Sequence, residues 1–138
     1  MRDIKEKNPE RGAALVELAM VLPLLLLILV GIIELGLLFY NQQVLTNASR
    51  EGARAGIAYA TGIPDIVDNY CQSRLITFGP VPPVNTVVTG GVSYPNDLKI
   101  TVIYDYTFFV PELLGFGPTK TLSASTEMRM ESFNPTGT

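Results

Sequence analysis

Residues 12–40 read GAALVELAMVLPLLLLILVGIIELGLLFY, and this stretch decides the fold. From Leu18 to Ile33 it contains no charged side chain. A helix needs about 20 apolar residues to cross the hydrocarbon core of a bilayer, so the run is long enough to span a membrane. Glu17 lies at its edge, and an ionisable group at such a position is costly and indicates a function. The sequence therefore predicts a membrane-spanning helix with a functional carboxylate near one end.

A basic leader before an apolar run also suggests a secretory signal peptide. The apolar part of a signal peptide covers about 7 to 15 residues, which is shorter than this run. No small-x-small cleavage motif ends the run, which continues through Glu34 to Tyr40. We therefore expect the segment to be retained as an anchor. Pro23 should kink this helix because it removes a backbone hydrogen bond, and Glu34 is interpreted either as an interfacial acid or as a specifically paired one.

The orientation of the helix follows from the basic residues in front of it. Four of the ten Lys and Arg residues lie among the first eleven positions. Positive charges in a short flank mark the cytoplasmic side of a membrane helix. We predict that residues 1–12 form a cytoplasmic leader, that residues 13–40 cross the cytoplasmic (inner) membrane once, and that residues 41–138 form an exported domain. That domain would be periplasmic or extracellular.

Composition argues against several classes of function. The net charge of −3 gives no basic footprint for nucleic acid. The chain has no histidine, which is the commonest general base and metal ligand. A glycine-rich phosphate loop and a cluster of metal ligands are also missing from the sequence. We therefore predict no enzyme activity, no cofactor and no metal. The single cysteine, Cys71, is expected to be a buried free thiol or to form an intermolecular bridge.

Helical sequence continues beyond the membrane segment to about Ala60, so the helix should be about 70 Å long and project from the bilayer. Its outer half carries small residues at every fourth position, namely Ala48, Gly52, Gly56 and Ala60. Glycine inside a helix costs about 1 kcal/mol relative to alanine, so these glycines need a reason. Either the stripe packs on the chain's own sheet, or it allows a helix of another subunit to approach closely.

Three charged residues, Arg50, Glu51 and Arg54, lie in the same outer half of the helix. Glu51 and Arg54 are three positions apart and could form an ion pair. The two arginines share a face and would repel each other unless an acid lies between them. Solvated side chains and contacts with lipid headgroups are the remaining interpretations.

The rest of the chain predicts a short second helix near residues 65–75, followed by strands. Ile66, Tyr70 and Leu75 are expected to face inward from that helix. Residues 84–93 are rich in β-branched side chains and are interrupted by Gly90 and Gly91, which suggest a bulge. Apolar and polar residues alternate over 98–108 and over 122–131. One-sided alternation predicts an antiparallel sheet of three to four strands with one face covered, here by the outer half of the long helix. The predicted class is α+β, with a pilin-like arrangement.

The segment RGAALVELAMVLPLLLLILVGIIELGLLFYNQQVLTNASREGARAG, residues 11–56, resembles the N-terminal signature of TadE-like proteins. These are minor pilins, or pseudopilins, of the tight-adherence (Flp, type IVb) pilus system. The resemblance rests on Gly12 with Glu17 five residues later, on Pro23, on Glu34, and on NASREGAR at 47–54. The strand LSASTEMRME at 122–131 is also similar to the C-terminal strand of the family.

The resemblance implies that a prepilin peptidase cuts between Gly12 and Ala13, and that the mature chain takes part in pilus assembly. The implied partners are this peptidase, other pilin or pseudopilin subunits, the inner-membrane assembly platform and the lipid bilayer. Cleavage would expose an amino group at Ala13 with a pKa near 8. Glu17 of a neighbouring subunit can pair with it, and a buried pair of this kind would enforce register.

Three alternatives remain for the function. The chain could be an uncleaved single-pass scaffold or chaperone of a pilus or secretion complex, with Glu17 as a plain interfacial acid. It could be a pseudopilin of a secretion system. A membrane-tethered enzyme is the least favoured alternative.

Overall fold

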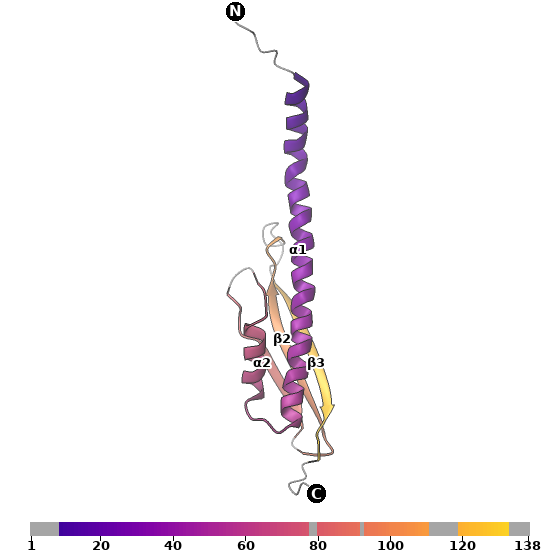
Figure 1. Ribbon diagram of the computed structural model, residues 1–138, viewed down its shortest axis with the longest axis vertical. Helices are drawn as coiled ribbons and strands as arrows, with labels where there is room; N and C mark the ends of the chain where they lie inside the picture. The colour runs from indigo at the N-terminus through magenta and orange to yellow at the C-terminus, as the bar shows by residue number, and fades with distance from the viewer. Residues whose placement is uncertain (1–8, 78–79, 92, 111–118, 133–138) are drawn as a thin grey trace, which may run out of the picture.

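The computed structural model describes residues 9–77, 80–91, 93–110 and 119–132. It contains two helices and three strands, shown in Figure 1: α1 (Pro9–Ile57), α2 (Ile63–Gln72), β1 (Asn85–Gly90), β2 (Asp97–Thr107) and β3 (Thr119–Arg129). The predicted class is confirmed, because a long N-terminal helix is followed by a short helix and an antiparallel sheet. The part of the predicted leader before Pro9, most of the loop after β2 and the C-terminal tail lie outside the described residues.

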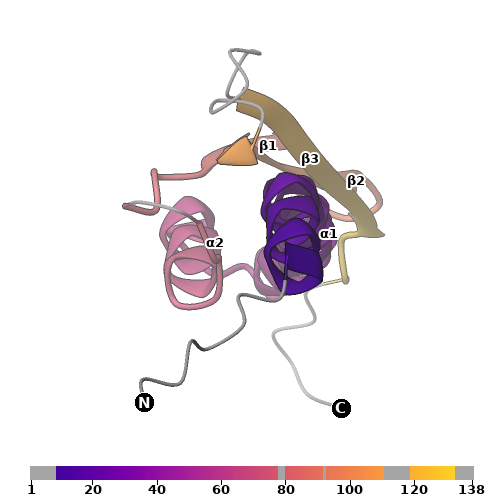
Figure 2. The same cartoon turned by 90° about the horizontal axis from the view of Figure 1, so that it is seen from above.

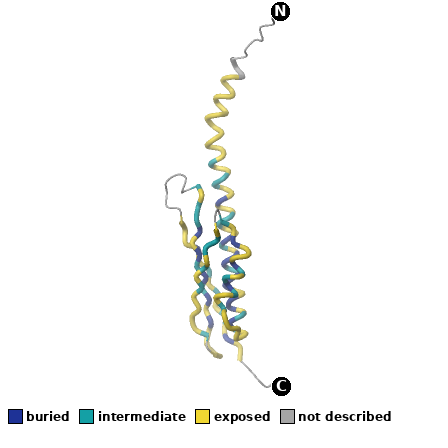
Figure 3. Tube along the Cα trace, turned by 90° about the vertical axis from the view of Figure 1, so that its left-hand side faces the viewer, coloured by how far each residue is buried: buried dark blue, intermediate teal, exposed yellow. Residues whose placement is uncertain are grey.

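Helix α1 is longer at its start and shorter at its end than the predicted range of 13–60. It begins at Pro9, continues through Pro23 and ends at Ile57. Proline suits the first turn of a helix, because its missing N–H has no partner there. At the other end Tyr59 has a φ of 57°, and this left-handed residue ends the helix. Figure 3 shows α1 as a gently curved rod that passes well beyond the domain.

The sheet has the order β1-β2-β3, and both pairs of neighbours are antiparallel. In the centre of the sheet Val102 pairs with Thr86 on one side and with Ala124 on the other. The alternation predicted for β2 is confirmed, because every second residue faces the core. The buried residues of β2 are Leu98, Ile100, Val102, Tyr104 and Tyr106. On β3 the predicted inward positions include Leu122, which is buried, while Ala124 is half-buried.

One face of this sheet is covered by the outer half of α1, with α2 beside it, as the view from above in Figure 2 shows. Leu45 and Ala48 of α1 join the strands in the core, together with Val67 and Cys71 of α2. The expected inward positions of α2 were only partly right, since Leu75 is buried but Ile66 and Tyr70 are half-buried. Helix α2 packs against both α1 and β1, and its buried face is formed by Val67 and Cys71.

Gly90 and Gly91 lie at the end of β1 and do not form a bulge inside the strand. Strand β1 stops at Gly90, and Gly90 and Gly91 have φ values of 80° and 69°. Glycine adopts this left-handed region without the steric cost of a Cβ atom. A Cβ on Gly91 would also lie 2.7 Å from the Cβ of Leu98. The glycine pair therefore makes the turn into β2 and lets Leu98 pack closely beneath it.

Candidate assembly and membrane-contact site

The first half of α1 projects from the domain as an apolar shaft, defined here as residues 13–40. Within its most apolar window no residue is buried. The domain contacts only part of it, mainly toward the outer end, where Leu37 and Leu38 pack against the core. The large exposed apolar side chains of this shaft include Leu15, Val16, Met20, Leu24, Ile28, Ile32, Leu35 and Phe39. Soluble monomers rarely expose contiguous apolar surface beyond a few hundred Å². The shaft is therefore built to contact lipid or apolar protein.

The predicted processing site lies near the start of this shaft. Gly12 and Ala13 are exposed and helical, so the bond between them lies in the first turns of α1. A Cβ on Gly12 would meet no atom within 4 Å. Glu17 is exposed one helical turn after Ala13, and within the described ranges it makes no ion pair. The structure thus places Ala13 and Glu17 on one face, open to a partner.

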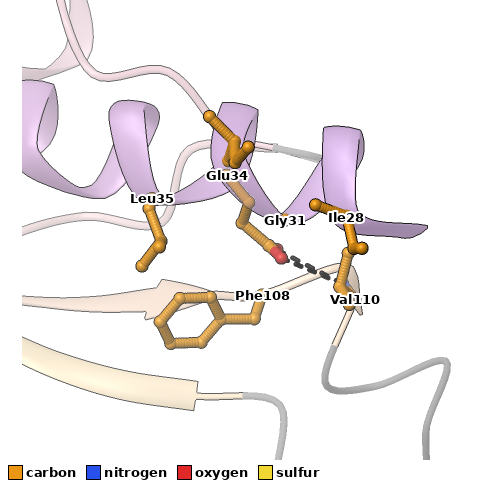
Figure 4. A pocket seen from close by; sticks show the side chains of 7 residues that line it. Ile28, Gly31, Glu34, Leu35, Phe108 and Val110 are labelled. Carbon is orange, nitrogen blue, oxygen red and sulfur yellow. Dashed lines mark hydrogen bonds between the residues drawn. The ribbon is translucent and has the colours of Figure 1, made fainter. Parts of the chain in front are cut away.

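Glu34 is the site residue for which sequence reasoning offered a choice, and the interfacial interpretation was wrong. Its side chain is 3% exposed. Its carboxylate accepts hydrogen bonds from two consecutive backbone N–H groups just after β2, those of Phe109 and Val110, with a Val110 N to Oε2 distance of 3.1 Å. Figure 4 shows Glu34 pointing from α1 toward the chain at Val110. These partners lie about 75 positions away in sequence, so no local signal could have revealed them.

Three further polar side chains fasten the outer half of α1 to the domain. Asn41 is fully buried; its Nδ2 donates to the Ile76 carbonyl at 2.6 Å and its Oδ1 accepts from the Ile76 N–H at 3.0 Å. Ser49 is buried and its Oγ lies 2.7 Å from the Thr126 Oγ1 on β3. Gln42 donates to a carbonyl of the same strand. Buried polar groups are stable when they are hydrogen-bonded in this way.

The stripe of small residues packs inside the chain's own domain. Ala48, Gly52 and Gly56 are buried, whereas Ala60 lies beyond the helix end and is exposed. A Cβ on Gly52 would come within 2.6 Å of Val67 Cγ2 on α2. The structure therefore does not support the alternative in which this stripe contacts a helix of another subunit. The glycines instead let α1 approach α2 and β2 closely.

The charged residues of the outer helix lie on the opposite, solvent-facing side. Arg50, Glu51 and Arg54 are all exposed. Among the residues that the structure describes, the ion pair is that between Arg129 and Asp97 across β3 and β2, at 3.2 Å. The pair that Glu51 and Arg54 could have made is therefore not formed. Their exposure fits both solvated charges and contacts with lipid headgroups.

Cys71 is fully buried and has a free thiol, as one of the two predictions for it stated. Burial, and to a smaller extent the nearby Asp68 carboxylate, raise the pKa of this thiol to about 11. A thiol in this environment stays protonated and is a poor nucleophile. Over the described ranges no group of three or more His, Cys, Asp and Glu side chains is placed to hold a metal ion.

The shaft and the domain together define a class of protein. One helix is long and apolar enough to cross a membrane, and a small α+β domain packs on its far half. This indicates a single-pass membrane protein that carries a folded domain on one side.

Comparison with known families agrees with this class. Residues 12–54 match the family described as TadE-like protein, so the resemblance noted for the helix is confirmed over that range. The matched range covers 43 of the 138 residues of the chain. The matched range contains Gly12, Glu17, Pro23, Glu34 and the NASREGAR segment, whereas the strand at 122–131 lies outside it. Searches of curated proteins and of solved structures found no match.

Proposed function

We propose that this chain is a minor pilin or pseudopilin of a tight-adherence type IVb pilus, and that a prepilin peptidase cuts it after Gly12. In this proposal the shaft holds the precursor in the cytoplasmic membrane with its N-terminus inside and its domain exported. After cleavage the same shaft packs among the helices of other subunits. The observation that carries the proposal is the exposed, apolar shaft with an open Glu17, within a range that matches TadE-like proteins.

The role proposed for Glu17 follows from its surroundings. It is the only charged side chain of the shaft between Ala13 and Ile33. It makes no ion pair with the described residues of its own domain, which pack on the outer half of α1. In a bundle of shafts this carboxylate would lie in an apolar environment and need a positive partner. The new amino group at Ala13 of a neighbouring subunit supplies one when helices are staggered axially. Removing one partner of such a buried pair costs about 3 to 5 kcal/mol, which would exclude uncut subunits from the assembly.

The first test is the intact mass of the chain recovered from its native membrane and from the sheared surface fraction. We expect a chain that begins at Ala13. Gly12→Val should retain the full-length mass, because a branched side chain replaces the residue next to the cut. Glu17→Gln should be cut normally yet fail to assemble. Glu51→Gln, a matched change of an exposed glutamate on the same helix, should be cut normally and should also assemble. Full-length protein in functional pili would refute the proposal.

One observation favours a second candidate, an uncleaved single-pass scaffold or chaperone. The Gly12–Ala13 bond is helical, whereas a protease cleft generally takes its substrate extended, so cutting requires this turn to unwind. The two candidates differ in the mass measurement. A chain that keeps Met1 to Gly12 beside an active peptidase would leave the function to the exported domain.

A further inference from the structure

The chain just after β2 lies against the apolar shaft, within the range predicted to cross the membrane. Residues Phe108, Phe109 and Val110 are called here the 108–110 turn. One hollow of about 340 Å³ lies between this turn and α1 residues from Ile28 to Leu35, and another of about 350 Å³ lies between it and α1 residues from Pro23 to Val30. Figure 4 shows the first of them, with Phe108 and Val110 facing Ile28, Gly31 and Leu35. The second hollow therefore extends along α1 as far as Pro23.

The length of α1 decides what surrounds this turn when the helix spans a bilayer. The hydrocarbon core is about 30 Å thick. Residues 12–22, which precede the α1 residues that line the two hollows, provide about 16 Å of helix at 1.5 Å per residue. The bilayer cannot shift further toward the N-terminus without burying Arg11 and Glu10. Residues 23–34 must therefore supply the other half of the span, and the 108–110 turn lies beside them.

Two backbone N–H groups of the turn are paired as a lipid environment requires. An irregular backbone is tolerated at membrane depth only where its N–H and C=O groups find protein partners. The buried Glu34 carboxylate accepts from the N–H groups of both Phe109 and Val110. The Phe109 side chain is 47% exposed, and Phe109 also lines the second hollow beside α1.

We propose that the 108–110 turn is a membrane-inserted anchor that contacts phospholipid acyl chains in the leaflet on the side of the domain. The two hollows beside it are acyl-chain contacts, continuous with the lipid-facing surface of the shaft. Glu34 is the positioning residue that makes this insertion possible, because it satisfies two backbone N–H groups where water is absent. The anchor fixes the height and tilt of the domain above the bilayer. The inference rests on α1 spanning a membrane and is independent of cleavage and of pilus assembly.

The test uses tryptophan as a depth probe, because the chain contains none. Three single variants of the full-length chain are reconstituted in phosphatidylcholine vesicles: Phe109→Trp at the turn, Leu26→Trp on the neighbouring face of α1, and Tyr94→Trp in the connection before β2. Leu26 and Tyr94 are 49% and 57% exposed, so all three sites accept the larger ring. Fluorescence is quenched either by lipids brominated on their acyl chains or by acrylamide in water.

The expected result is that Phe109→Trp behaves like Leu26→Trp. Both should be quenched by the brominated acyl chains to a similar fraction and be several-fold less sensitive to acrylamide than Tyr94→Trp. Adding Glu34→Ala to the Phe109→Trp variant should raise its acrylamide quenching toward that of Tyr94→Trp. A Phe109→Trp signal that matches Tyr94→Trp in both assays would overturn the proposal. Shielding from both quenchers would also overturn it, since another protein subunit would then cover the turn. Leu26→Trp without acyl-chain quenching would remove its basis.

Discussion

The glycine at position 56 gives the most direct test of how the helix is held on the sheet. A Cβ at Gly56 would overlap the Cδ2 atom of Leu98 and lie 3.1 Å from the Cδ1 atom of Ile63. Leu98 is 1% exposed and has little room to move, because it also lies against Gly91, where an added Cβ would overlap it as well. Gly56→Ala therefore adds a methyl group to a site without room for it.

The size of the effect follows from two opposing terms. Alanine is the better helix former by about 1 kcal/mol. Overpacking a core by one methyl group costs about 1 to 3 kcal/mol. We expect Gly56→Ala to lower the free energy of unfolding by about 0 to 2 kcal/mol overall. Gly36→Ala is the matched control, because its new Cβ meets nothing within 4 Å and only the helix-propensity gain of about 1 kcal/mol remains.

The assay is urea-dependent pulse proteolysis of the full chain in detergent micelles, with Leu98→Ala included to close a double-mutant cycle. Leu98→Ala alone should cost about 2 to 5 kcal/mol through the cavity it leaves. In the double variant the methyl group at position 56 occupies part of that cavity, so the double loss should be about 0.5 to 3 kcal/mol smaller than the sum of the single losses. Additivity, or a Gly56→Ala variant as stable as Gly36→Ala, would refute the packing argument.

Three further predictions concern the hydrogen bonds of Asn41, which hold α1 to the domain, and the buried thiol of Cys71. Asn41→Ala removes the hydrogen-bond partner of both the N–H and the carbonyl of Ile76. The free energy of unfolding should therefore fall by about 1 to 3 kcal/mol for each group. The same measurement on Gln43→Ala, a change at an exposed neighbour, should show little difference. Cys71 should react with iodoacetamide many-fold more slowly in the native chain than in urea at pH 8, and equal rates would contradict its burial. Because its pKa rises from 9.0 to about 11 on folding, the unfolded chain loses this proton first, and stability should decline as the pH rises from 9 to 11. Urea titrations over this range should show a shallower decline for Cys71→Ala, and an unchanged slope would contradict that assignment.

Much of the fold could be read from periodicity. The uncharged run after Glu17 predicted the shaft, and the alternation from Leu98 onward predicted the buried face of β2 correctly. These predictions succeeded because both patterns are local: a span needs only length and hydrophobicity, and a half-covered strand needs only a period of two. The helix ends and the inward face of α2 were less accurate, because tertiary contacts with α1 and β1 select them.

The candidate site also has a part that the sequence predicts and a part that only the tertiary structure reveals. The sequence alone determined that a membrane-length helix carries a carboxylate near its start and small residues in its outer half. It left open which surface those small residues meet, and only the tertiary structure decided that Gly52 and Gly56 pack on the chain's own α2 and β2. The same holds for Glu34, whose partners come from the far end of β2. A local pattern records which way a residue faces, whereas a contact between distant segments exists only once the chain has folded.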